Sequence, residues 1–131
     1  MMPVRIQLSR RKGWKMPENT VKVDRSTKWG NPFVVADDRS RARCVELFHI
    51  MLSGYLCVSD TPSVEAQEAY RAMAKRDRAE LLGRNLACWC PLCADHKAGR
   101  PAGDTCTACA PCHADILLTL LPAPRCEAVA P

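Results

Sequence analysis

Residues 88–113 read CWCPLCADHKAGRPAGDTCTACAPCH and contain six of the nine cysteines of the 131-residue chain. A gap of two residues lets a single tight turn aim both side chains at one ion. That gap occurs four times here, between Cys90 and Cys93, Cys93 and His96, Cys106 and Cys109, and Cys109 and Cys112. The odd number of cysteines and the lack of an export signal disfavour a disulfide framework. The spacing therefore predicts a metal site.

The connector between the cysteine turns, residues 97–105, contains two glycines and one proline and can bring the turns together. Such a pair of turns is typical of a tetrahedral zinc site, and an iron–sulfur cluster is the main rival. Two ligand sets are open, because Cys93, Cys106 and Cys109 can be completed by His96 or by Cys90. If His96 is the fourth ligand, a second set of residues remains: Cys88, Cys90, Cys112 and His113. This second set could form another zinc site or a reactive pocket.

The hydrophobic pattern predicts an α+β domain with a small three-strand sheet, two to three flanking helices and a zinc-stabilised loop. The expected strands cover residues 4–8, 20–24 and 86–90, and the expected helices cover 40–55, 61–82 and 113–121. Asp38 or Ser40 can cap the first helix, and Thr61-Pro62 is expected to open the second. A single domain over 1–122, with a zinc-binding insertion at about 91–110 and a flexible tail over 123–131, accommodates these elements.

The chain shows no apolar run long enough to span a bilayer, and its start lacks the apolar core of a signal peptide. We therefore expect a cytoplasmic protein. Eight basic and two acidic residues lie within the first thirty, and they account for the whole excess in the net charge of +5. A basic loop at Arg10, Arg11 and Lys12, near Trp14 and Trp29, can attract phosphates and stack bases. It predicts a nucleotide or nucleic-acid partner, with a solvated basic loop as the alternative.

Cys112 and His113 stand at the start of the last expected helix, where the helix dipole lowers a thiol pKa. A thiolate beside a histidine is one arrangement for a nucleophile, so Cys112 and His113 are candidate catalytic residues, with Asp115 as a further assistant. Further metal ligands, or structural residues, are the alternatives. A cytidine-deaminase site is excluded, because that pattern requires His-x-Glu and a proline before its cysteine pair. The chain has no His-x-Glu, and Thr105 precedes Cys106.

Three blocks of sequence resemble an uncharacterised bacterial and phage family called domain of unknown function 4326. They are VKVDRSTKWGNPF at 21–33, GRNLACWCP at 83–91 and PCHADILL at 111–118. The resemblance covers about residues 4–121 and implies a compact single domain without naming an activity. Many relatives join the second and third blocks by a much shorter loop. The resemblance thus implies that Cys93, His96, Cys106 and Cys109 came with an insertion, and that Cys88, Cys90, Cys112 and His113 belong to a shared site.

These observations favour a zinc-binding domain with one pocket. We expect this pocket where the blocks at 83–91 and 111–118 meet the Trp29-Gly30-Asn31 turn. We expect Trp29, Gly30, Asn31, Cys88 and Cys90 to line it, beside Cys112 and His113. A nucleotide or nucleic acid is the expected ligand. The alternatives are a cysteine-dependent enzyme acting on a nucleotide or base, and a zinc-stabilised module for protein interaction. The sequence leaves open whether the protein is an enzyme.

Overall fold

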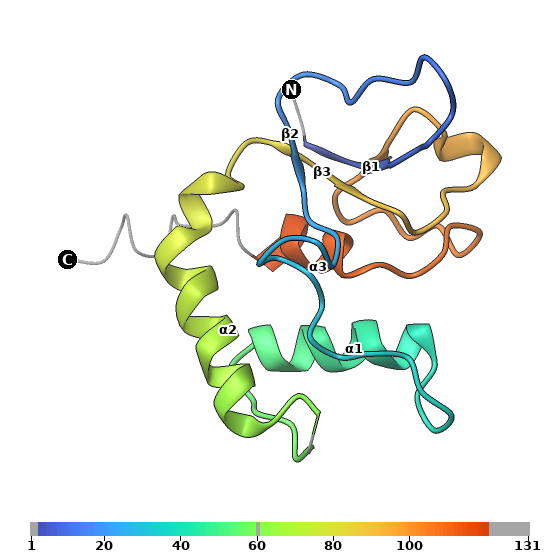
Figure 1. The fold of residues 1–131 in the computed structure, drawn as a ribbon. Helices are drawn as coiled ribbons and strands as arrows, with labels where there is room; N and C mark the ends of the chain where they lie inside the picture. The colour runs from blue at the N-terminus through green and yellow to red at the C-terminus, as the bar shows by residue number, and fades with distance from the viewer. Residues whose placement is uncertain (1–2, 60, 121–131) are drawn as a thin grey trace.

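The computed structural model describes residues 3–59 and 61–120, so the predicted tail at 123–131 lies outside the described residues. Within this part the fold is α+β, with three α-helices, two short 3-10 helices and one sheet (Figure 1). In chain order the elements are β1 (Val4–Gln7), β2 (Thr20–Lys22), α1 (Arg41–Leu52), α2 (Val64–Asp77), η1 (Arg78–Glu80), β3 (Asn85–Cys88), η2 (Ala94–His96), β4 (Arg100–Pro101) and α3 (His113–Leu120).

The sheet has four strands in the order β2-β3-β1-β4, one more than the three predicted. β2, β3 and β1 run parallel, so their carboxyl ends meet at one edge of the sheet. The extra strand, β4, lies within the cysteine-rich segment and pairs antiparallel with β1, with Arg100 opposite Arg5. A two-residue strand has no alternation of apolar residues, and Pro101 signals a turn, which is why the sequence pattern did not predict β4.

α1 and α2 each begin where a serine hydroxyl accepts a backbone N–H. Ser40 caps α1 as predicted, through a 3.1 Å hydrogen bond from the Arg43 amide. The second helix begins at Val64 and not at Thr61, because Ser63 accepts a 3.1 Å hydrogen bond from the Ala66 amide. Thr61-Pro62 therefore precedes the helix instead of opening it. Among the described residues, no helix combines the length and the apolar character needed to cross a membrane.

The core is built around α3, which lies between the sheet and α1 in Figure 1 and contacts β1, β3 and α1. Its buried Leu117 and Leu118 join a large apolar cluster that includes Phe48 of α1 and Leu86 of β3. The opposite face of the sheet carries a smaller cluster of Ile6, Leu8 and Ala87, against which Trp14 and Trp89 pack. The N-terminal loop is thereby held against the sheet.

Arg5 on β1 is fully buried on the α3 side of the sheet. Its Nη1 donates a 2.6 Å hydrogen bond to the Asp115 carboxylate on α3, and its Nη2 donates to the carbonyls of Cys90 and Pro91 at 3.1 and 3.2 Å. Arg100 approaches the same carboxylate at 3.3 Å. Arg5 thus joins β1, α3 and the turn that follows β3.

Replacing Arg5 by alanine is expected to lower the free energy of unfolding by about 3 kcal/mol, because breaking a buried ion pair strands its partner groups. Urea unfolding followed by circular dichroism measures this. Arg43→Ala is the matched control, since Arg43 pairs with Glu46 on the exposed surface of α1 and such pairs contribute about 0.5 kcal/mol. Equal losses in the two variants would contradict the role assigned to Arg5.

Candidate metal centre and strand-end pocket

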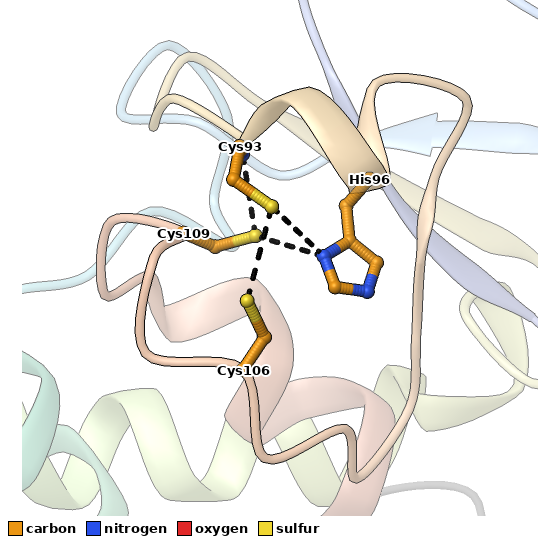
Figure 2. A group of neighbouring side chains, drawn as sticks. All are labelled: Cys93, His96, Cys106 and Cys109. Atoms are coloured by element: carbon orange, nitrogen blue, oxygen red, sulfur yellow. Dashed lines mark hydrogen bonds between the residues drawn. The ribbon is translucent and has the colours of Figure 1, made fainter.

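The structure brings together four side chains that can hold a metal ion, which we name the first cluster: Cys93, His96, Cys106 and Cys109. Their ligand atoms all lie within 4.8 Å of one another and point to a common centre (Figure 2). His96 Nδ1 lies 3.1 Å from Cys93 Sγ and 3.4 Å from Cys109 Sγ, and the sulfur atoms of Cys93 and Cys106 are 3.8 Å apart. His96, and not Cys90, completes this group.

Local backbone structure places each ligand of the first cluster. Cys93 precedes η2 and His96 ends it, and the His96 amide donates a 3.0 Å hydrogen bond to the Cys93 carbonyl. This single turn sets the two side chains on one side. The Cys93 amide donates to Cys109 Sγ at 3.4 Å, an interaction that stabilises a thiolate. The sequence spacing of two residues therefore produced the expected turn.

Asp104 orients the imidazole of His96. Its Oδ2 lies 3.4 Å from His96 Nε2, while its Oδ1 accepts a 2.7 Å hydrogen bond from the Cys106 amide. A carboxylate on the far nitrogen of a metal-binding histidine fixes the ring and leaves the near nitrogen for the ion. Nδ1 of His96 is the atom that faces the three sulfurs. Asp104 thus acts as a positioning residue for the first cluster.

The protonation state of the cluster is set by its own contacts. The neighbouring His96 lowers the pKa of the Cys93 thiol to about 7, and the Cys93 sulfur in turn raises the pKa of His96. The amide of Cys106 lowers the pKa of Asp104. Burial raises the pKa of Cys109. A metal ion that binds here displaces protons from thiols and imidazole, so its binding weakens as the pH falls.

A second cluster of three thiols lies at the end of β3 and the start of α3: Cys88, Cys90 and Cys112. These sulfur atoms also lie within 4.8 Å of one another, and Cys88 and Cys90 are 4.0 Å apart. The Ala114 amide donates to Cys112 Sγ at 3.5 Å, so Cys112 caps α3. The structure contains these cysteines as free thiols. The second cluster shares no residue with the first.

His113 stands beside the second cluster and outside its ligand group. Its Nε2 lies 2.7 Å from the Val23 carbonyl, and its Nδ1 lies 3.8 Å from Cys112 Sγ. Burial lowers the pKa of His113 and so favours the neutral imidazole. In that form Nε2 carries the hydrogen and donates it to the Val23 carbonyl. Interactions with Cys88 and Cys90 raise the pKa of Cys112, whose exposed fraction is only 1%. These features do not support Cys112 as an activated nucleophile.

A cavity of about 380 Å³ opens beside the second cluster, at the carboxyl ends of β2 and β3. Its wall contains the predicted Asn31, Cys88, Cys90, Cys112 and His113, together with unpredicted residues: Asp24, Arg25, Ser26, Val34, Val35, Arg41, Cys44, Val45, Trp89 and Pro111. The parallel strand ends and the start of α3 are the usual surroundings of a ligand in an α/β layout.

Trp29 and Gly30, which we expected in the pocket, are not among its lining residues. Trp29 is buried in the main core, where its carbonyl accepts a 2.8 Å hydrogen bond from the Tyr70 hydroxyl. Gly30 packs against the backbone of Arg25, since a Cβ at residue 30 would lie 2.7 Å from Arg25 Cα. Trp29 and Gly30 therefore pack away from the cavity, and only Asn31 of this turn lines it.

One residue of the basic N-terminal loop contacts a side chain of the pocket wall. The guanidinium of Arg10 lies 4.3 Å from the centre of the Trp89 ring, and Trp89 is part of the pocket wall. Trp89 Nε1 donates a 2.8 Å hydrogen bond to Asp24, which fixes the indole. Arg10, Arg11 and Lys12 are exposed. Arg10 therefore places a positive charge next to the wall residue Trp89.

The sequence pattern missed several residues that build these sites. Arg5 and Asp104 have no regular spacing to the cysteines, and Asp115 proves to pair with Arg5 and Arg100 and does not line the pocket. The position of Asp104 two residues before Cys106 is the only hint of its role in the sequence. Its Oδ1 contact with the Cys106 amide depends on this short separation.

Residues 6–123 match the family described as Domain of unknown function (DUF4326). The chain belongs to this family. The match includes the second half of β1, the strands β2 to β4, the helices α1 to α3 and both clusters. No curated protein and no solved structure matches the chain significantly. The family supplies no activity, so the function of this DUF4326 domain has to be argued from its own side chains.

Replacing Asp104 by asparagine is expected to weaken metal binding at the first cluster by roughly 10- to 100-fold, the usual cost of losing the carboxylate behind a histidine ligand. Competition between the protein and a chromophoric chelator for Co²⁺ measures the affinity. Asp95→Asn is the control, because Asp95 is an exposed carboxylate of the same loop outside the cluster. Unchanged affinity in Asp104→Asn would refute the positioning role.

Proposed function

We propose that this DUF4326 protein is a zinc-binding domain whose strand-end pocket binds a nucleotide or a nucleic acid. The observation that supports the ligand is a cavity of nucleotide size whose wall and rim combine Trp89 with arginine side chains. The zinc and the pocket make separable contributions, so each is argued and tested by itself.

Zinc fits the donor atoms of the first cluster. Three thiols and one imidazole form a complete tetrahedral set for zinc, and a set without an open position is typical of a structural site. The ion would hold residues 93–109, a stretch with little apolar core of its own. That stretch carries Arg100, which donates to the carbonyls of Asp104 and Cys106 and reaches Asp115 on α3. The zinc would thus fasten the loop to the rest of the domain.

The pocket has the size and chemistry expected for a nucleotide. Small-molecule sites occupy roughly 300–1,000 Å³, and the cavity of about 380 Å³ suits one base with its sugar and phosphate. Arg41 at the first turn of α1 and Arg25 line the wall and provide positive charge for a phosphate. Trp89 lines the wall, and a base could stack on its indole in place of Arg10, which lies over the ring in this structure. Asp24 and Asn31 supply polar atoms in the same wall.

The N-terminal loop extends the same chemistry beyond the cavity. Arg10 packs on Trp89, and Arg11 and Lys12 follow it on the surface. If a nucleic-acid strand placed one nucleotide in the pocket, the phosphates of its next nucleotides would contact this loop. A single nucleotide would depend mainly on Arg41, whereas a strand would depend on Arg10, Arg11 and Lys12 as well. This difference separates the two ligands by experiment.

For the zinc, His96→Ala and Cys106→Ala are each expected to remove one equivalent of bound metal, measured by elemental analysis of protein purified under reducing conditions. The loss should also lower the melting temperature, because a structural zinc contributes on the order of 10 kcal/mol to folding the residues it holds. Cys57→Ala is the control, since Cys57 lies outside both clusters. Wild-type metal content in both cluster variants would contradict the proposed site.

For the ligand, quenching of tryptophan fluorescence by nucleoside phosphates and by a short single-stranded oligonucleotide should report binding. Replacing Arg10, Arg11 and Lys12 by alanine is expected to weaken oligonucleotide binding and to reduce its salt dependence by about 0.7 in slope for each phosphate that the variant no longer neutralises. The same charge change at Arg71, Lys75 and Arg76 is the control, because α2 contributes nothing to the pocket wall. Equal effects of the two triple variants would exclude the basic loop as the binding surface.

Arg41→Ala distinguishes the pocket from the loop, because Arg41 lines the cavity whereas Arg10, Arg11 and Lys12 do not. A loss of mononucleotide binding in Arg41→Ala with retention in the N-terminal triple variant would support the pocket as the nucleotide site. Binding of neither ligand class to the wild-type protein would sink the proposal.

A further inference from the structure

The second cluster has a geometry that the proposed nucleotide binding does not use. Cys88, at the end of β3, is 6% exposed, and Cys112, immediately before α3, is 1% exposed. Cys90 is half-buried between them. Three sulfur atoms within 4.8 Å of one another, brought from two elements, form a group that can hold a thiophilic metal ion.

Hydrogen bonds to residues outside the first cluster hold the backbone around these thiols in place. Arg5 holds the carbonyl of Cys90 at 3.1 Å, and the Leu8 amide donates to the carbonyl of Cys88 at 2.8 Å. Cys112 Sγ accepts the Ala114 amide at the start of α3. Zinc-bound thiolates commonly accept such amide hydrogen bonds, and donors around a metal tune and orient its ligands. The three sulfur atoms therefore need no large backbone movement to bind an ion together.

The three cysteines of this group all border the cavity, so an ion among them would border the 380 Å³ space. The imidazole of His113 donates through Nε2 to the Val23 carbonyl, and its Nδ1 lies 3.8 Å from Cys112 Sγ without joining the group of three sulfur atoms. His113 Nδ1 is therefore the protein atom that competes with the pocket molecule for the fourth position. Asn31 and Asp24 lie in the pocket wall but outside the group as well. A zinc ion held by three protein ligands keeps an open position, as in catalytic sites and unlike the closed first cluster.

We propose that Cys88, Cys90 and Cys112 bind a second zinc ion, whose open position accepts a nitrogen or oxygen atom of the molecule in the strand-end pocket. Three thiolates and one Zn²⁺ carry a net charge of −1, and Arg25 and Arg41 in the same wall provide positive charge to balance it. The ligand class is a small molecule with a lone-pair donor, such as a base nitrogen, a carbonyl oxygen or water. The open position gives the pocket Lewis-acid chemistry that the first cluster lacks.

Metal content of the intact chain provides the first test. Wild-type protein purified with reductant and dialysed against metal-free buffer is expected to retain two equivalents of zinc. Cys90→Ala should retain one, and Cys57→Ala should retain two. Cys90 is chosen because it is the least buried member of the cluster, and circular dichroism checks that the variant folds. One equivalent in the wild type, or two in folded Cys90→Ala, would overturn the second site.

The open position is tested on the unmutated protein, so the result does not depend on a variant that folds. Co²⁺ substituted for zinc gives visible bands that report its ligands, and azide binds only where the coordination sphere is open. Azide should shift part of the Co²⁺ spectrum of the wild type and leave that of Cys90→Ala unchanged. A wild-type spectrum that azide does not alter would overturn the open position, whatever the metal count. Neither measurement requires a nucleotide, so failure here is distinct from failure of the proposed ligand.

Discussion

The arrangement of both clusters depends on the buried guanidinium of Arg5. A buried charge needs a paired charge and hydrogen bonds. The two Nη atoms of Arg5 bind Asp115 and the carbonyls of Cys90 and Pro91, whereas its buried Nε has no hydrogen-bond partner among the described residues. Those partners belong to α3 and to the turn after β3, the two places from which the second cluster comes. Asp115 also forms an ion pair with Arg100, so the same carboxylate contacts the loop that carries the first cluster. One ion-pair network therefore locates both groups of sulfur atoms relative to the sheet.

The two clusters are nested in the sequence. The first cluster, Cys93 to Cys109, lies between the two halves of the second, which are Cys88 with Cys90 and Cys112. Closing the inner group shortens the path between the outer halves, because the intervening residues no longer sample an open loop. A structural ion in the first cluster would thus favour the approach of Cys112 to Cys88. With an ion bound, the inner group would make the loop rigid, whereas the outer group borders the cavity.

Regular spacing made part of this structure predictable. The two-residue gaps predicted a group of Cys93, Cys106 and Cys109 with either His96 or Cys90 as its fourth member, and Asp38 or Ser40 was expected to cap α1, because both signals act within a single turn. Features that depend on distant residues were not accessible. Arg5 alternates with apolar neighbours as an exposed strand residue would, yet it is fully buried by a partner 110 positions away. Trp29 resembled a stacking residue for a ligand, whereas packing placed it in the core. β4 is too short to show a period, so the sheet was expected to have three strands.

The short strand β4 covers the outer side of β1 and so closes one border of the sheet. Its two residues, Arg100 and Pro101, pair with Arg5 and Val4 on this side of β1. An uncovered strand border is a template for pairing between separate chains and for aggregation. Because β4 belongs to the loop between His96 and Cys106, the ligands of the first cluster also hold this cover in place. An ion bound by those ligands would thereby oppose aggregation of the protein through pairing of β1 strands from separate molecules.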